Sequence, residues 1–499
     1  MSLDLSNLYS LIRDKDYLLE KCLLLLPSIA YNYHEIYEEV KDRVSELGRR
    51  SLVLLGEAAL FLEDNETFAR VEKLFNYWFS RDPKEVLELA SFMIIRFSKD
   101  WDKFEKFFDR IAEVLKNIGR NKGRGLASVN LFFELFFRYA FLFSIEIDNI
   151  LEKVYGFYQN LSSVENFYQV LTAYLRHSLF LKPPHRSVLL IYEKFYEKIA
   201  KKDVFNIPFV AALILALKTI GKEKLTNDIF KEVSNEWIVY GDSSTLFSFS
   251  RRLLGRTGLL FALTREADLD QFISEASKLV QEFSRILQYL LDFQTSLFAG
   301  ESFSPRDLDE FTEYAMNFLK EKTGAKEVQE DVLFYVESVA NNLSEAIDSL
   351  IYNIYNSMLA TRQFNRYSNL LQSLQKLYRD SPEIEVGFHF RLRNSLAMLL
   401  SVINGEWALE SFRKSVNEIS NICKRDRECL AWLSNDLGVK LGYAAAISEN
   451  NEFVTLLCDA VKERRINKRQ LIRGFASSLY GVISVLRFGR RYREIKFPI

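Results

Sequence analysis

The chain is poor in the residues that form turns and crosslinks. Its 499 residues include only 19 Gly, 8 Pro, 4 Cys and 4 His. Scarce Gly and Pro exclude most β-rich folds, because the strands of such folds need frequent turns. Four cysteines are too few for a disulfide framework in a chain of this length. Hydrophobic residues make up 48% of the sequence and supply ample material for a core. We therefore expect an all-α protein.

Segments for targeting or membrane insertion are also lacking. The amino-terminal run MSLDLSNLYSLIRDKDYLLEKCLLLL carries Asp14, Lys15 and Asp16 ahead of its apolar part, and no small-residue cleavage site follows. The most apolar segments, 126–145 and 207–221, are interrupted by polar or charged side chains. We expect both to be buried helices of a cytoplasmic protein that has no membrane span.

No catalytic or metal-binding motif is present. Phosphate loops, nucleophile elbows and dinucleotide fingerprints are missing, and the histidines His34, His177, His185 and His389 are isolated in the sequence. We expect no catalytic residues, no metal, no cofactor and no enzymatic activity. An unrecognised helical enzyme is a third hypothesis, which a buried cluster of these histidines with carboxylates would support.

Two of the cysteines flank a short charged turn. Cys423 and Cys429 occur in the run CKRDREC. A metal site would need further ligands, and no histidine lies nearby in the sequence. We expect two reduced, partly buried thiols, with oxidation to a disulfide as the alternative.

Helical periodicity is nearly continuous. In 65–79 it places Phe68, Val71 and Phe75 on one face, and 101–115 repeats the pattern with aromatic residues. Phe68 and Trp101 are 33 residues apart, which is the length of one helix pair with its loops.

Near the carboxyl end, aromatic residues recur after short polar turns. Phe364, Trp407, Phe453 and Tyr492 each open a predicted helix, at intervals of 43, 46 and 39 residues. The turn Asn404-Gly405-Glu406-Trp407 resembles the turns of tetratricopeptide (TPR) repeats. This resemblance implies a helical-repeat fold that binds protein partners. TPR repeats have a small residue three positions after the turn aromatic, whereas this chain has larger residues at the corresponding positions: Val71, Phe104, Tyr367, Glu410, Leu456 and Ile495. We therefore expect a degenerate solenoid of the broader TPR/HEAT-like class.

The middle of the chain differs from both ends. Apolar residues alternate in steps of four and three over 272–297, and again over 332–358. Both segments predict helices of about thirty residues with a coiled-coil type of seam. We expect the two helices to form an antiparallel hairpin, and dimerisation through the same seam is the alternative. The predicted division is a helical array at 1–240, the long-helix hairpin at 241–362 and a TPR-like array with a basic end at 363–499.

Charge is unevenly distributed, although 66 basic and 67 acidic residues almost cancel. Residues 462–496 contain eleven basic and two acidic side chains, and 301–348 contain four basic and twelve acidic ones. The basic end, as we call it, predicts an anion-binding or nucleic-acid-binding surface. Its candidate residues are Arg464, Arg465, Lys468, Arg469, Arg473, Arg487, Arg490, Arg491, Arg493 and Lys496.

The position of these residues on the predicted helix matters. We expect a helix over 468–487 that is capped by Asn467 and ends at Gly489. Cations near the end of the helix interact favourably with the helix dipole. Lys468 and Arg469 at its start interact unfavourably with the dipole unless an anion compensates their charge.

A second basic segment, GRNKGRG, lies just before the apolar helix at 126–145. Its glycines could turn backbone N–H groups toward an anion near a helix start, and a solubilising loop is the alternative. The candidate residues of this secondary anion loop are Lys116, Arg120, Lys122 and Arg124.

Together these features predict a non-enzymatic helical-repeat scaffold that binds a protein partner along an extended surface. The alternative is a nucleic-acid-binding subunit that uses the basic end. The long helices allow a homo-oligomer, and nothing in the sequence indicates a membrane partner.

Overall fold

The structure is a computed structural model of the whole chain. It describes residues 3–11, 21–22, 34–95, 101–119, 124–179, 181–197, 207–229, 269–298, 343–344, 347–348, 350–359, 361–381, 387–424, 426–463 and 465–492. Within these ranges the chain is all-α and has no strand.

The first half of the chain consists of short and medium helices. They are α1 (Ser6–Leu11), α4 (His34–Lys41), α5 (Arg49–Phe61), α6 (Asn65–Arg81), α7 (Leu87–Met93), α8 (Trp101–Gly119), α9 (Arg124–Leu142), α10 (Asp148–Asn160), α11 (Val164–Arg176), α12 (His185–Ile191) and α14 (Ile207–Thr219). Short 3-10 or π turns follow several of them: Val44–Glu46, Pro83–Val86, His177–Leu179 and Tyr192–Tyr196.

The second half contains the longest of the described helices, α17 (Leu269–Phe298), α25 (Lys468–Tyr492) and α23 (Arg427–Ser448). It also contains α20 (Ser368–Asp380), α21 (Phe388–Leu400), α22 (Gly405–Cys423) and α24 (Asn451–Lys462). A 3-10 turn at Phe364–Tyr367 leads into α20, and residues 350–359 are also helical.

The aromatic faces predicted from the sequence are buried. Phe68, Val71 and Phe75 of α6 belong to the core, as do Phe104 and Phe108 of α8. Helix α6 begins where Asp64 accepts a hydrogen bond from the Thr67 backbone N–H at 3.0 Å. Because this cap satisfies a backbone donor that the helix leaves unpaired, it fixes the start of the helix.

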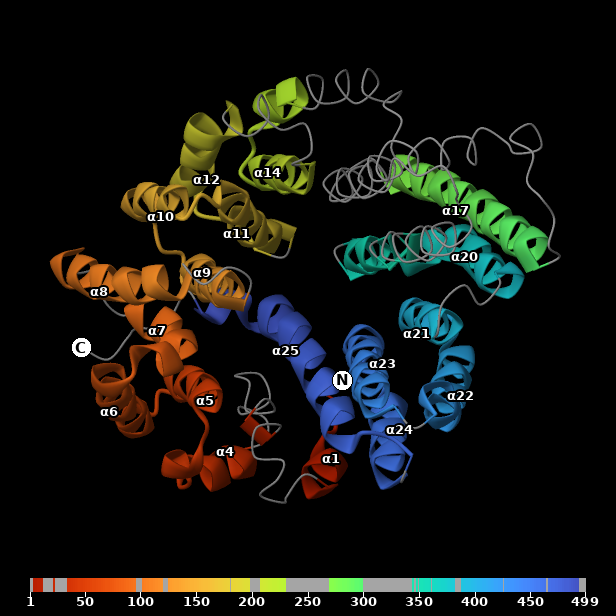
Figure 1. Cartoon of the computed structure of the whole chain (residues 1–499), viewed down its shortest axis with the longest axis horizontal. Helices are drawn as coiled ribbons and strands as arrows, with labels where there is room; N and C mark the ends of the chain where they lie inside the picture. Colours follow the sequence, from red (N-terminus) through yellow and green to blue (C-terminus); the bar gives the residue numbers. More distant parts are fainter. Residues whose placement is uncertain are drawn as a thin grey trace.

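Packing follows a regular order in both halves. In the first, α5 packs on α7, α7 on α9, α9 on α11 and α11 on α14. In the second, α21 packs on α23 and α23 on α25, while α22 packs on α24. Most helices also contact their neighbour in the chain, so the helices lie in two layers. Figure 1 shows α4 to α14 along one arc and α17 to α24 along another, with α25 between them.

The two ends of the chain meet. Helix α25 reaches α5 and α9, where the Tyr480 hydroxyl donates a hydrogen bond to Glu57 Oε2 at 2.7 Å, across 423 positions of sequence. Tyr139 of α9 donates to the same oxygen at 3.2 Å, and the Arg138 guanidinium lies 4.2 Å from the Tyr480 ring centre. Helix α1 packs on α24. The chain is therefore closed by contacts of α25 and α1, as Figure 1 shows.

Two expectations about the carboxyl end are wrong. Helix α25 does not end at Gly489, and Tyr492 is its last residue instead of opening a new helix. A helix-interior glycine costs about 1 kcal/mol relative to alanine, which does not end a helix unless the chain also turns there. The turn aromatics at Trp407 and Phe453 do lie at the starts of α22 and α24.

The long-helix prediction is confirmed for its first member. Helix α17 spans thirty residues, and its seam residues Phe272, Ala276, Leu279 and Phe283 are buried. It packs on α20. Most of the second long helix lies outside the described residues, as does the acidic region 301–348 except for 343–344 and 347–348.

The predicted domain boundaries stay predictions. The boundary at 240 lies outside the described residues, and the boundary at 363 falls in a turn where Arg362 has φ 55°. One described helix segment, Gly125–Leu142, is long and apolar enough to cross a membrane by length and composition, and half of it is buried inside the structure.

Candidate docking and anion-binding surfaces

Helices α23 and α25 form a closely packed pair. A Cβ atom added to Gly438 would lie 2.1 Å from the Leu471 backbone oxygen, and one added to Gly474 would lie 2.3 Å from the Asn435 backbone oxygen. Gly442 approaches Ser478 and Phe475 in the same way. Because these backbones touch, no side chain larger than hydrogen fits at the three positions. The two helices are thus held in a fixed relative position, and so are the side chains on their other faces.

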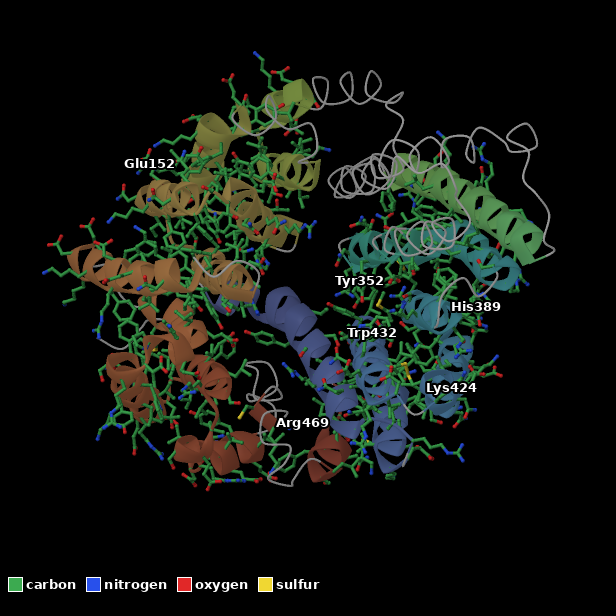
Figure 2. All side chains as sticks on the ribbon, viewed as in Figure 1. Glu152, Tyr352, His389, Lys424, Trp432 and Arg469 are labelled. Carbon is green, nitrogen blue, oxygen red and sulfur yellow. A yellow bond between two sulfur atoms is a disulfide. The ribbon has the colours of Figure 1, made fainter. Side chains whose placement is uncertain are left out.

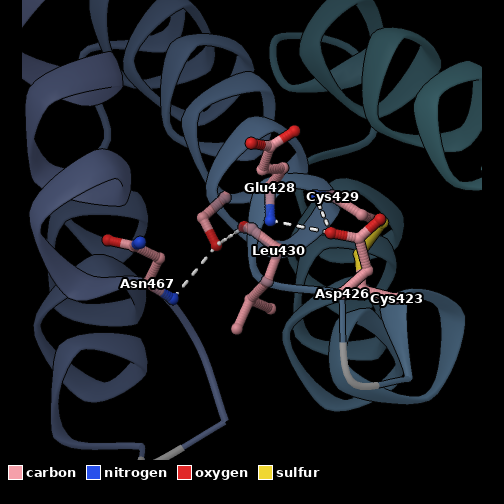
Figure 3. Close-up of a disulfide and its surroundings, with 7 residues drawn as sticks. Cys423, Asp426, Glu428, Cys429, Leu430 and Asn467 are labelled. Carbon is pink, nitrogen blue, oxygen red and sulfur yellow. Dashed lines mark hydrogen bonds between the residues drawn. A yellow bond between two sulfur atoms is a disulfide. The ribbon is translucent and has the colours of Figure 1, made fainter.

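The turn before α23 contains a disulfide between Cys423 and Cys429. Asp426 caps α23 by accepting hydrogen bonds from the backbone N–H groups of Glu428 and Cys429, at 2.8 and 3.1 Å (Figure 3). This cap turns the chain so that the two cysteine Cα atoms lie 5.4 Å apart, a separation that a disulfide spans. The expectation of two reduced thiols is therefore wrong, and the disulfide alternative is correct.

Helix α23 of this closely packed pair carries an exposed tryptophan. Trp432 of α23 has 52% of its surface exposed, and the Arg391 guanidinium of α21 lies 5.2 Å from its ring centre. Arg391 also donates a hydrogen bond to Ser344 Oγ. Figure 2 labels Trp432 among the C-terminal helices. Arginine stacked on an exposed aromatic ring is a common feature of protein-binding surfaces.

A buried lysine holds the two helices of this surface together. Lys440 of α23 is 1% exposed, and its Nζ atom donates to Asp436 Oδ2 at 3.0 Å and to the Arg391 backbone oxygen at 3.3 Å. The charge is thus paired inside its own helix and also hydrogen-bonded to α21. This fixes the backbone of Arg391 relative to α23, and with it the stacked pair Trp432–Arg391.

The basic end is anchored by the predicted cap. The Asn467 side chain accepts a hydrogen bond from the Gln470 backbone N–H at 3.2 Å, and its own backbone N–H donates to Ser434 Oγ of α23 at 3.1 Å (Figure 3). Lys468 and Arg469 therefore stand in the first turn of α25, as expected, and Figure 2 places Arg469 at that end.

The structure describes only part of the basic end. Arg465 and Arg469 are exposed, and Lys468 and Arg473 are half-buried. Among the described residues, no acidic side chain forms an ion pair with Arg465, Lys468 or Arg473. The last turns of α25 contain three further candidates, Arg487, Arg490 and Arg491. Three others lie outside the described residues: Arg464, Arg493 and Lys496.

The secondary anion loop is divided between two helices. Lys116 is exposed in the last turn of α8, and Arg124 is the first residue of α9, while Arg120 and Lys122 lie outside the described residues. A Cβ on Gly119 would lie 2.9 Å from the Leu161 side chain. This glycine thus allows close packing, a role that the sequence interpretation did not give it.

The four histidines occupy separate helices. His34 begins α4 and lies 3.5 Å from Glu38, His185 begins α12, and His389 contacts the Ser381 backbone oxygen. Burial, together with the nearby Arg138 charge, lowers the pKa of His177 to about 3. Within the described ranges, no three His, Cys, Asp or Glu side chains gather into a metal-binding group.

Sequence reasoning missed Trp432, the glycine contacts and the docking of α1. The run LGVKLG, with glycines four residues apart, was the available signal for a close helix contact.

Comparison of the chain with models of protein families, with curated proteins and with solved structures finds no match.

Proposed function

We propose that this chain is a non-enzymatic scaffold of the TPR/HEAT-like helical-repeat class, and that it binds a protein partner. Support for the repeat arrangement comes from the packing of each inner helix on the next but one, from α5 to α14 and from α21 to α25. Stacked helix pairs with this connectivity present long surfaces for peptides or helices. A cytoplasmic location belongs to the same proposal. Dimerisation through the long helices does not, because the seam residues Phe272, Ala276, Leu279 and Phe283 of α17 are already buried within the chain.

The observation that carries the proposal is the exposed Trp432 stacked with Arg391. Burying a tryptophan is among the largest hydrophobic gains a side chain offers, so a partner that covers Trp432 would gain stabilisation from this side chain. Tryptophan and arginine are also the residue types most enriched at binding hot spots. The glycine-packed α23–α25 pair and the buried Lys440 hold this surface in place. A preformed surface loses little entropy when a partner binds.

A photocrosslinking experiment tests the proposal. A benzophenone amino acid replaces Trp432 in cells that produce the protein, and the control replaces Tyr77 of α6. Tyr77 is a matched control because it is 44% exposed and also carries a stacked arginine, Arg81, at 4.1 Å. We expect a discrete protein adduct at 432 that is lost when Arg391→Ala is added. The absence of an adduct at 432, or identical adducts at both positions, would overturn the proposal.

A second candidate function is nucleic-acid binding at the basic end. It is favoured by Lys468 and Arg469 in the first turn of α25, where positive charge opposes the helix dipole. It is also favoured by Arg465 and Arg473, for which the described part of the chain supplies no ion-pair partner. Fluorescence anisotropy with labelled DNA and RNA from low to high salt tests it. Submicromolar binding with a steep salt slope, lost on reversing the charges of 464, 465, 468 and 469, would support it. Negligible binding at low salt would exclude it.

A further inference from the structure

The amino-terminal segment is bound to α24 like a short peptide ligand. Leu3, Leu5 and Leu8 are all buried, and α1 packs on α24. The Asp4 backbone N–H donates a hydrogen bond to Asn451 Oδ1 at 2.8 Å, across 447 positions of sequence. The segment thus combines three buried leucines with one directed polar bond to the start of α24, which is the usual composition of a docked peptide.

The docked segment also supplies the cap of its own helix, α1. The Asp4 carboxylate accepts a hydrogen bond from the Ser6 backbone N–H at 3.0 Å, just before α1 begins. The side chain of Asp4 therefore caps α1, and its backbone points to Asn451. Asn451 itself is not needed as the cap of α24, because Asn450 accepts from the Glu452 backbone N–H at 2.9 Å. The Asn451 side chain can thus accept a hydrogen bond from the backbone of a docked segment.

The segment is also tethered. Ten positions after the end of α1, Lys21 is fully buried, and its Nζ atom lies 3.0 Å from Glu39 of α4. Release of α1 from α24 would leave it attached through this point. Because α1 remains part of the same chain, it competes with a free ligand intramolecularly, and a covalent connection raises its effective concentration at the site.

We propose that the surface of α24 covered by α1, the α24 face, is a docking site for a partner's short helix, and that α1 occupies it in cis. This proposal rests on the proposed scaffold function and names its partner class. The partner segment has leucines at its first, third and sixth positions, and a short polar residue able to cap a helix at its second, as in Leu3-Asp4-Leu5-Ser6-Asn7-Leu8.

A cleavable tether tests the proposal in the full-length protein. A protease site is placed between Leu11 and Lys21, the folded protein is cut, and the freed segment is removed by gel filtration. Binding of a fluorescein-labelled peptide with the sequence of residues 1–11 is then measured by anisotropy for cut and uncut protein. We expect the cut protein to bind at least about tenfold more tightly, because the tethered segment competes in the uncut protein.

Two variants test the leucine contacts and the Asn451 hydrogen bond separately. A peptide with both Leu5→Asp and Leu8→Asp is expected not to bind, because charges would replace two buried leucines. Asn451→Ala in the cut protein should weaken peptide binding about three- to tenfold through loss of one hydrogen bond, since the Asn450 cap remains.

Three outcomes would overturn the proposal. They are equal peptide binding by cut and uncut protein, retention of the cut segment through gel filtration with no uptake of labelled peptide, and loss of helical circular dichroism on its removal. The last two would make α1 a permanent part of the fold. None of these outcomes affects the crosslinking test at Trp432, so a failure here is distinguishable from failure of the scaffold function.

Discussion

The contact between α23 and α25 predicts opposite effects for one substitution at two positions of the same helix. Gly474→Ala and Gly481→Ala both replace a helix-interior glycine of α25, seven residues apart. A Cβ at 474 would lie 2.3 Å from the Asn435 backbone oxygen and 2.9 Å from the Val439 backbone nitrogen, whereas a Cβ at 481 would have nothing within 4 Å. Gly481 is therefore a matched control for propensity.

The magnitudes follow from two opposing effects. Alanine is favoured over glycine by about 1 kcal/mol in a helix interior, so Gly481→Ala should raise the free energy of unfolding by roughly 0.5–1 kcal/mol. At 474 the same gain is opposed by overpacking, which typically costs about 1–3 kcal/mol and more where only backbone can move. Since backbone atoms cannot rotate away as a side-chain tip does, we expect Gly474→Ala to be destabilising by about 2 kcal/mol net.

Urea denaturation followed by tryptophan fluorescence measures the difference. Trp432 in α23 and Trp407 in α22 report from this region. We expect the midpoint to fall for Gly474→Ala and to rise slightly for Gly481→Ala, with Gly438→Ala resembling the former because its Cβ would lie 2.1 Å from the Leu471 backbone oxygen. Equal midpoints for the two α25 variants would show that the helices do not approach as described, and the reasoning would fail.

Three further predictions concern other contacts. Thiol titration of the denatured, unreduced protein should find two reactive cysteines, and reduction of Cys423–Cys429 should lower stability by about 2 kcal/mol for a loop of this length; four thiols without reductant would contradict the disulfide. Tyr480→Phe should destabilise the protein by about 1–3 kcal/mol, because buried Glu57 loses a donor, and an unchanged urea midpoint would argue against the closure contact. Burial holds the pKa of His177 at about 3 in the folded chain, below its ordinary value of about 6.5. The unfolded state therefore binds the proton first, so the free energy of unfolding should fall as pH drops from about 6.5 toward 3, and His177→Phe should flatten that dependence.

Features that depend on neighbouring residues were predicted from the sequence. The faces of α6, α8 and α17 follow from the spacing of apolar residues, and the Asn467 cap follows from a side chain three residues from its donor. These are short-range relations, so the local sequence specifies them directly. The end of α25 was misjudged because a glycine weakens a helix without requiring it to stop.

The candidate surfaces were predicted only in part. The basic residues at the start of α25 lie where the sequence placed them, because a helix start and its cap are local features. Trp432 gave no such signal, because whether a tryptophan is covered depends on which helices surround it. Close contacts through Gly438 and Gly474 likewise need a second backbone to explain them, and that backbone lies more than thirty residues away.

The sequence by itself thus determined an all-α chain, the faces of several helices, the Asn467 cap and the concentration of charge at its carboxyl end. Only the tertiary structure decided that Tyr480 meets Glu57, that α1 docks on α24 and that Cys423 pairs with Cys429. The physical reason is range. Helix periodicity and capping act within a few residues, whereas chain closure depends on the shapes and polar groups of surfaces that are hundreds of residues apart and meet only when the chain is folded.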